Sequence, residues 1–326
     1  MLVLAGAGSG KTRVITHRIA HLVRERGVPV GQILAITFTN KAAGEMRERI
    51  LELVGPEARG LWASTFHSAC ARILRIEHAA AGYERSFTIY DDGDQQRLMR
   101  AVIAEEGLDP KRTTPRAVLG VISSAKNELK GPSEVEDDAN GDYGVEVISR
   151  LYKRYQDRLI ANQAMDFDDL LMVTVQLLQR DSVVRERWQR RFRHVLVDEY
   201  QDTNHAQYWL VRILAEPERN VMVVGDDDQG IYSWRGADIR NILEFKADYP
   251  DAVTIPLEQN YRSSATILAA ANAVVERNRG RHPKVLWTDR ESGEDVTIAS
   301  SADEYEEARM VVREVGRAIA EGRPLD

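Results

Sequence analysis

The chain has 326 residues, of which 43% are hydrophobic, a length and composition that favour about two globular domains. Lys and Arg number 44 against 51 Asp and Glu, so the net charge of −7 gives no support for nucleic-acid binding, which would need local patches. A single cysteine, Cys70, excludes an intrachain disulfide, and no apolar run reaches the ~18 residues of a membrane helix. We expect a cytoplasmic protein without a membrane partner.

The first predicted elements are a strand and a helix joined by a glycine-rich turn. Residues 2–5 form an apolar run without alternation, as in a buried parallel strand. From residue 12 to residue 26 the period becomes helical, since Ile15, Ile19, Leu22 and Val23 share one face. Between them lies LAGAGSGKTR, residues 4–13. The order strand, turn, helix is typical of a phosphate-binding loop.

This loop has the residue types needed to hold a triphosphate. Glycines at 6, 8 and 10 allow positive φ and turn successive N–H groups toward one point, beside the positive end of a helix. An exposed Lys11 at the loop mouth would reach the β- and γ-phosphates, and Thr12 would offer a hydroxyl to Mg²⁺. Two alternatives fit these residues less well. A dinucleotide-binding fingerprint would need glycine at position 11, where this chain has lysine. A plain glycine-rich turn would require that Lys11 and Thr12 follow it by chance. The expected ATP-binding residues are Ala5, Gly6, Ala7, Gly8, Ser9, Gly10, Lys11 and Thr12.

Between this loop and the next motif lies a long helical stretch. Residues 67–190 are mostly helical in pattern, with a polar loop predicted over residues 130–143. Such a stretch is too long to be part of one nucleotide-binding unit. We therefore predict an all-α insertion within a parallel-sheet core.

Two further apolar runs end in polar side chains. Residues 195–197 precede Asp198 and Glu199, and residues 221–224 precede an acidic triplet and Gln229. Ligands of open α/β sheets bind at the carboxyl ends of the strands, so we expect Asp198 to hold Mg²⁺ and Glu199 to act as the base. Gln229 could sense the γ-phosphate, although such a residue is more often found in a simple turn. The triplet lacks the alternating ligand spacing of an EF-hand calcium loop.

Aromatic and polar residues also cluster where strands should end. TFTNKAA (37–43) follows the predicted strand 33–36, TFHS occupies 65–68, and Ile231–Arg235 follows Gln229. A tyrosine, a tryptophan and an arginine so close together could stack on unpaired bases. The alternative is that Tyr232 and Trp234 are core residues. His67 alone is more typical of a turn or core histidine than of a DNA contact.

Together these segments resemble the UvrD/PcrA/Rep family of superfamily 1 DNA helicases. The matching segments are AGAGSGKTR (5–13), TFTNKAAGEMRER (37–49), TFHS (65–68), DFDDLL (166–171), VDEYQDTN (197–204), VGDDDQGIYSWRGA (224–237) and LEQNYRSS (257–264).

The resemblance implies roles for individual residues. Arg13 and Tyr261 would sandwich adenine, Arg262 would contact the γ-phosphate, and Arg235 would couple nucleotide state to DNA. The catalytic set would be Lys11, Glu199, Gln229 and Arg262, with Thr12 and Asp198 at Mg²⁺. The DNA-binding set would be Phe38, Thr39, Asn40, His67, Tyr232, Trp234 and Arg235.

The resemblance also implies an architecture. We expect an α/β P-loop NTPase with a RecA-like parallel sheet (1–66 and 191–257), the all-α insertion (67–190) and the beginning of a second RecA-like domain (258–326). The family has an adenine-reading glutamine segment upstream and further motifs downstream that are not found in this sequence. We therefore expect a truncated, N-terminal helicase fragment that does not itself unwind DNA.

The implied activity is ATP hydrolysis coupled to 3′-to-5′ movement on single-stranded DNA and to duplex unwinding, in DNA repair or replication restart. The partners would be single-stranded DNA, single-strand/duplex junctions and DNA repair proteins. Two alternatives remain: a helicase subunit of a RecB- or AddA-like nuclease complex, and a regulator that binds nucleotide without hydrolysing it.

Overall fold

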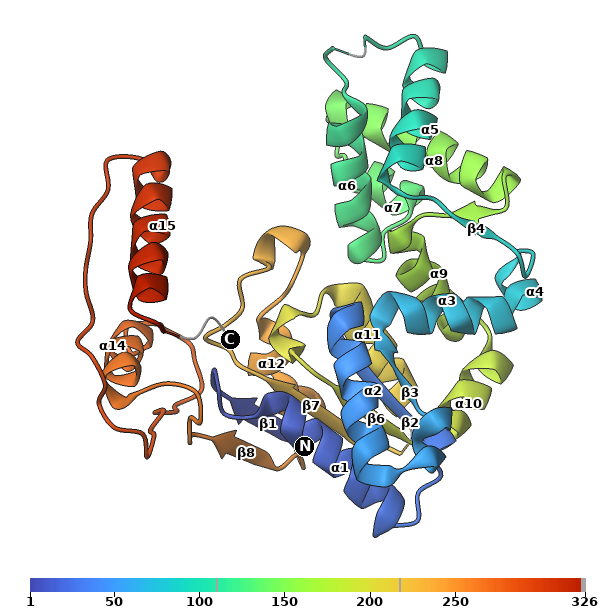
Figure 1. Cartoon of the computed structure of the whole chain (residues 1–326). Coiled ribbons are helices and arrows are strands. Elements are labelled where there is room, and N and C mark those ends of the chain that lie inside the picture. The colour runs from blue at the N-terminus through green and yellow to red at the C-terminus, as the bar shows by residue number, and fades with distance from the viewer. Residues whose placement is uncertain (110, 217, 324–326) are drawn as a thin grey trace.

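The computed structural model describes residues 1–109, 111–216 and 218–323; the last three residues of the expected second domain lie outside this range. Within it, a six-stranded parallel sheet runs through the centre of the core (Figure 1). The strand order is β3-β2-β6-β7-β1-β8. The strands are β1 (Leu2–Ala5), β2 (Ile33–Thr37), β3 (Trp62–Thr65), β6 (His194–Val197), β7 (Val221–Gly225) and β8 (Thr254–Leu257). The predicted parallel α/β fold is confirmed.

Both faces of this sheet are covered, which explains why its strands are apolar throughout. Along β1, Leu2 and Leu4 join one hydrophobic core while Val3 and Ala5 join another. On the Val3 face lie α1 (Lys11–Arg24), α2 (Asn40–Val54) and the short 3₁₀ helix η2 (Pro56–Gly60), and a second 3₁₀ helix, η1 (Val30–Gln32), precedes β2. The opposite core includes residues of α3 (Phe66–Ile76), α4 (His78–Ala81), α9 (Phe167–Arg180), α10 (Ser182–Arg191), η3 (Tyr200–Asp202), α11 (His205–Ala215), α12 (Arg240–Leu243) and α13 (Phe245–Asp248).

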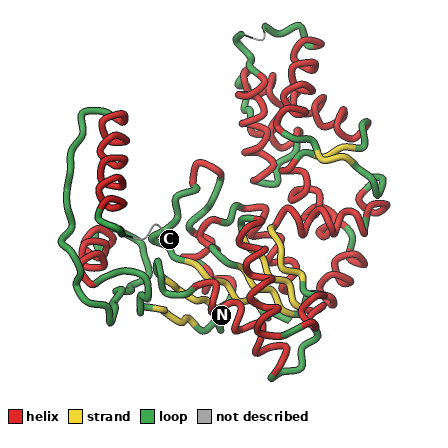
Figure 2. The backbone as a smooth tube through the Cα atoms, viewed as in Figure 1, coloured by secondary structure: helices red, strands yellow, loops and turns green. Residues whose placement is uncertain are grey.

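The inserted helices have a core of their own and project from one side of the sheet domain, as Figure 2 shows in the helix-rich part at upper right. This core includes Met99, Ile122, Leu151 and Tyr155. A short parallel pair, β4 (Thr88–Ile89) and β5 (Ala164–Met165), lies where the chain enters and leaves the insertion. The helices are α5 (Asp92–Glu105), α6 (Pro115–Asn127), α7 (Pro132–Asp138) and α8 (Tyr143–Ala161).

The prediction of an uninterrupted polar loop over residues 130–143 was wrong, because α7 lies within it. Pro132 occupies the first turn of this helix, where its missing N–H costs nothing. The carboxylate of Glu134 accepts a hydrogen bond from the N–H of Gly131 at 3.0 Å. Gly, Pro and Ser are typical of loops, but they are equally typical of helix starts.

After β8 the chain forms two further helices, α14 (Ala265–Val275) and α15 (Glu304–Ala320), and the 3₁₀ helix η4 (Ser233–Arg235) precedes α12. An isolated bridge pairs Gln259 with Trp287. The segment between α14 and α15 returns toward the ends of β1 and β7, and it meets the glycine loop where the side chain of Leu286 lies against Gly6. Among the described residues, no helix is long and apolar enough to cross a membrane.

Candidate nucleotide and nucleic-acid sites

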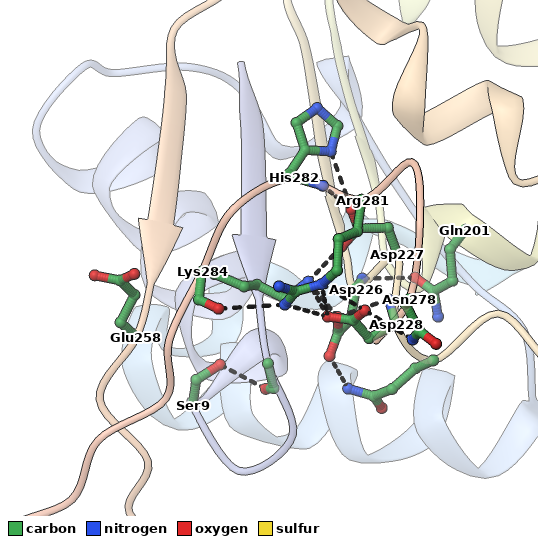
Figure 3. A network of polar contacts seen from close by, with 12 residues as sticks. Ser9, Gln201, Asp226, Asp227, Asp228, Glu258, Asn278, Arg281, His282 and Lys284 are labelled. Carbon is green, nitrogen blue, oxygen red and sulfur yellow. Dashed lines mark hydrogen bonds and ion pairs between the residues drawn. The ribbon is translucent and has the colours of Figure 1, made fainter. Parts of the chain in front are cut away.

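The glycine loop follows β1 directly and ends at the first turn of α1. Gly8 and Gly10 have φ values of 70° and 93°, a region that residues with a Cβ rarely adopt. A Cβ on Gly8 would lie 2.7 Å from side-chain atoms of Asn260 and Arg262, so glycine also permits the close approach of the chain after β8. The hydroxyl of Ser9 donates to the Gly6 carbonyl at 2.7 Å and closes the turn (Figure 3). The first N–H groups of α1 have no intrahelical partners and point into this loop.

Lys11 is less exposed than expected. Its side chain is 11% exposed, and Nζ donates to Oε1 of Gln229 at 3.2 Å. The same ammonium lies 3.5 Å from Oε2 of Glu199. The expectation of an exposed lysine was wrong. Parallel strands bring their carboxyl ends to one edge of the sheet, so the Glu199 carboxylate and the Gln229 amide oxygen both contact the Lys11 ammonium there. Lys11, Glu199 and Gln229 are thus brought together.

Two carboxylates follow β6 in contrasting surroundings. Asp198 is buried, and burial together with neighbouring Glu199 raises its pKa from 3.8 to about 6. A hydrogen bond with the Thr12 side chain opposes this rise. Glu199 is partly exposed and has a φ of 50°, a strained value for a residue with a Cβ. A buried carboxylate beside a hydroxyl provides the oxygen ligands that Mg²⁺ prefers, so Asp198 and Thr12 fit this ion.

A residue that sequence reasoning missed, Gln201, links the ends of β6 and β7. Its Nε2 donates to Oε2 of Glu199 at 2.9 Å, and its Oε1 accepts from the N–H of Asp226 at 3.0 Å. The side chain is buried, so the amide holds both neighbours in fixed positions. The only sequence signal was its position in the segment VDEYQDTN, two residues after Glu199, and nothing in the sequence indicated the contact with Asp226.

A cavity of about 440 Å³ opens over the glycine loop, within the size range of small-molecule sites. Arg262 lines it, as does Arg13, whose Nε lies 3.5 Å from Nε2 of His17. Tyr261 is 59% exposed and is not one of the described lining residues, although its N–H donates to the Gly8 carbonyl at 3.0 Å. Ala5, at the end of β1, and Ser9, within the glycine loop, are buried and are not among the residues that line the cavity. The lining residues are Gly6, Ala7, Gly8, Gly10, Lys11, Thr12, Arg13, Glu45, Arg49, Glu199, Gln229 and Arg262.

A second cavity, of about 600 Å³, collects six of the seven predicted DNA-binding residues from the ends of three strands. Asn40 is the exception; it begins α2 and is exposed. We call this cavity the aromatic groove. Among its lining residues are Phe38, Thr39, His67, Tyr232, Trp234 and Arg235.

Exposure distinguishes the two interpretations of Trp234. Its side chain is 72% exposed, so the alternative that it is a core residue was wrong. The Arg235 guanidinium lies 4.5 Å from the Trp234 ring centroid, and the centroids of the Tyr232 and Trp234 rings are 6.3 Å apart. Phe38 packs edge-to-face on Phe66 at 5.7 Å. The aromatic groove therefore presents exposed or half-buried π-faces beside a cation.

Polar residues without an assigned role complete the aromatic groove. Asn204 Nδ2 donates to Oδ1 of Asn127 at 2.5 Å, which ties the loop after β6 to the inserted helix α6. Asn127 in turn donates to Asp168 at 3.3 Å. Burial, together with neighbouring Asp166, raises the pKa of Asp168 to about 6, and burial lowers the pKa of His67. Asn204 and Asp168 lie in quoted motifs, but their spacing gave no sign that they would meet.

Comparisons with known proteins agree with this architecture. Residues 1–250 match the model of the UvrD/REP helicase N-terminal domain, and residues 255–325 match that of the UvrD-like helicase C-terminal domain. The chain is 51% identical over 323 residues to the ATP-dependent DNA helicase PcrA of Staphylococcus aureus (strain Mu50 / ATCC 700699), covering 99% of this chain and 44% of that protein. The same identity and coverage hold for PcrA of Staphylococcus epidermidis (strain ATCC 12228 / FDA PCI 1200). The chain thus spans less than half the length of these relatives. Because the N-terminal family model covers most of it, the chain belongs to the UvrD/REP helicase family.

Proposed function

We propose that this chain carries the ATP-hydrolysing motor core of a DNA helicase. The observation that carries the proposal is the convergence of Lys11, Glu199 and Gln229 on one cavity, with the aromatic groove also built from strand ends of the same sheet. The named relatives are ATP-dependent DNA helicases, which supports the same conclusion. Residues 1–66 and 191–257 would form the motor domain, residues 67–190 the insertion, and residues from 258 the beginning of a second domain. Within 67–190 only α5 to α8 have a core of their own, because α3, α4, α9 and α10 pack into the core of the sheet domain.

In the proposed reaction the phosphates of ATP lie over the glycine loop. Backbone N–H groups and the Lys11 ammonium bind the β- and γ-phosphates, and Glu199 accepts a proton from the attacking water. Gln229 orients the γ-phosphate, and Arg262 adds positive charge as the transition state forms. Asp198 and Thr12 would hold Mg²⁺, which supplies charge neutralisation beside the phosphates. Arg13 and Tyr261 would flank adenine, which requires Tyr261 to turn toward the cavity.

In the proposed DNA site, Phe38, Tyr232 and Trp234 offer sequence-tolerant stacking surfaces for unpaired bases. Thr39, Asn40 and His67 add polar contacts, and the Arg235 guanidinium lies 5.3 Å from the Tyr232 ring centroid and 4.5 Å from that of Trp234. Movement in the 3′-to-5′ direction, duplex unwinding, a repair or replication-restart role and contacts with repair proteins belong to the proposal for the longer protein. The alternatives of a nuclease-complex subunit and a non-hydrolysing regulator have no observation in their favour.

Lowering the pH through about 6 is expected to weaken Mg²⁺-dependent ATP binding, since a protonated carboxyl is a poor metal ligand. The pKa of Asp198 is raised to about 6, so the Mg²⁺-dependent part of the affinity is present above this pH and lost below it. A fluorescent ATP analogue titrated with Mg²⁺ or with EDTA across this range measures the effect. Asp198→Asn should remove the Mg²⁺-dependent part at every pH. A Mg²⁺ effect that persists in this variant would contradict the role of Asp198.

Trp234→Ala is expected to weaken binding of single-stranded DNA by roughly 5- to 150-fold, the loss of one base stack. The melting temperature should be nearly unchanged because the side chain is 72% exposed. The loss should be equal on oligo-dT and on mixed sequence, and the salt dependence should stay constant because no phosphate contact is removed. Ile231→Ala is the matched control, an exposed apolar residue of the same segment without a π-face. A large drop in melting temperature with unchanged DNA affinity would refute the stacking role.

A further inference from the structure

The acidic triplet that follows β7, residues 226–228, faces Arg281 and Lys284 of the segment after α14 (Figure 3). The Lys284 ammonium lies 2.8 Å from Oδ1 of Asp226 and 2.8 Å from Oδ2 of Asp228, and it also pairs with Asp227. Its side chain is 3% exposed. An ammonium has three N–H donors, so Lys284 can satisfy one carboxylate with each of them.

These carboxylates are close enough together to hold a metal ion, but Lys284 already supplies the cation. Arg281 adds a second one, with Nη2 2.7 Å and Nε 2.8 Å from the two carboxylate oxygens of Asp228. Burial raises the pKa of Asp228, but hydrogen bonds from Arg281 and Lys284 outweigh it and lower the value to about 2. The cluster is therefore an ion-pair network between β7 and the segment after α14.

One member of this cluster also contacts the nucleotide site. Oδ2 of Asp226 accepts a hydrogen bond from Nε2 of Gln229, whose Oε1 accepts from Lys11 at 3.2 Å. The N–H of Asp226 donates to Gln201, which holds Glu199. Asp226 thus fixes which end of the Gln229 amide faces Lys11, and it leaves the second N–H of that amide available for a phosphate oxygen.

We propose that Lys284 is a positioning residue for the γ-phosphate sensor Gln229, acting through Asp226. The inference rests on the proposed function. Lys284 holds Oδ1 of Asp226 together with the N–H of Asp228, which donates to the same oxygen at 3.1 Å, so Oδ2 is oriented toward Gln229. The segment between α14 and α15 is therefore connected to the nucleotide site by hydrogen bonds that pass through one buried carboxylate, Asp226. Nucleotide with a γ-phosphate would favour the state in which this segment is held against β7.

Arg281 provides a matched control within the same cluster. It is also a partly buried cation, but its contacts with the triplet go to Asp228 rather than to Asp226. Removing either residue takes one positive charge from the cluster. Arg281 also donates to the backbone carbonyl of Lys284 at 3.2 Å, but of the two cations only Lys284 contacts Asp226, so removal of Lys284 should directly disturb the carboxylate that orients Gln229.

The test measures the affinity of the 326-residue chain for fluorescent analogues of ATP and ADP with Mg²⁺. Lys284→Met should lower the preference for ATP over ADP by about tenfold, the value of one hydrogen bond to a charged group, with ADP affinity unchanged. Lys284→Arg should restore the preference, and Arg281→Met should leave it unchanged. In a chain carrying Gln229→Ala, adding Lys284→Met should have no further effect, because both changes act on one contact.

If the parent chain prefers ATP and Lys284→Met retains the full preference, or if Arg281→Met loses it equally, the positioning role is wrong while the proposed function stands. If the parent chain binds neither nucleotide, the proposed function fails and the inference fails with it. Should Lys284→Met not fold by circular dichroism, Asp226→Asn replaces it. This variant keeps the volume and removes the charge that Lys284 contacts, and an unchanged ATP preference in it would also overturn the inference.

Discussion

Glu199→Gln is expected to lower the rate of ATP hydrolysis by about 100- to 10,000-fold while ATP binding persists. The amide keeps the shape of the carboxylate and the strained backbone at φ 50°, but it cannot accept a proton from water. The Gln201 amide can still donate to the new side chain, so the ends of β6 and β7 should remain in place.

Phosphate release and binding of a fluorescent ATP analogue measure the two effects in the same preparation. Glu45→Gln is the control, because Glu45 also lines the cavity but lies on α2, away from the β6 end. Hydrolysis at the parent rate in Glu199→Gln would remove Glu199 from the mechanism. An equal loss in Glu45→Gln would show that the effect follows from removing any carboxylate of the cavity, and not from a specific role of Glu199 as the base.

Lys11→Ala is expected to abolish binding of ATP at concentrations that saturate the parent chain. In the proposed site its ammonium would supply a point charge to the phosphates, and the structure holds it 3.5 Å from Glu199 and 3.2 Å from Gln229. Hydrogen bonds to charged groups are among the strongest in proteins, so loss of the Lys11 ammonium should remove most of the affinity for the phosphates. The fold should survive, since Glu199 is partly exposed and can be solvated when its partner is removed.

Titration with a fluorescent ATP analogue and a thermal melt test this expectation together. Lys246→Ala removes an exposed lysine from α13 and should change neither measurement. Unchanged nucleotide binding in Lys11→Ala would contradict the assignment of the glycine loop.

The sequence predicted best those elements whose hydrophobic pattern matches the way they are buried in the fold. The runs 2–5, 195–197 and 221–224 are apolar without alternation because the sheet is covered on both faces, and all three lie in observed strands. The helix predicted for residues 12–26 is α1, which begins at Lys11 and ends at Arg24. The missed helix α7 is short and starts with Gly-Pro-Ser, so its composition could not separate a loop from a helix start.

The polar contacts were harder to predict, because they join segments distant in the sequence. Gln201 has an ordinary position in a motif, and only the register of β6 beside β7 brings its amide to Asp226. Lys284 contacts the acidic triplet because the segment after α14 returns to the sheet edge, which no periodicity reveals. The burial of Lys11 depended in the same way on Glu199 and Gln229, which follow other strands of the sheet.

Hydrogen–deuterium exchange of the 326-residue chain, read by mass spectrometry, tests whether one sheet edge holds both ATP and single-stranded DNA. The exchange is measured with a non-hydrolysable ATP analogue and Mg²⁺, or with oligo-dT. We predict that nucleotide protects residues 6–13, because phosphates bind the N–H groups of the glycine loop. The chain after β6 and β7 should also be protected, because Asp198, Glu199 and Gln229 would contact the nucleotide, Mg²⁺ or water through their side chains. Oligo-dT should protect residues 38–40 and 231–236 instead. Absence of nucleotide protection at the glycine loop, or DNA protection confined to segments outside the aromatic groove, would contradict the proposal that one sheet edge holds ATP and single-stranded DNA.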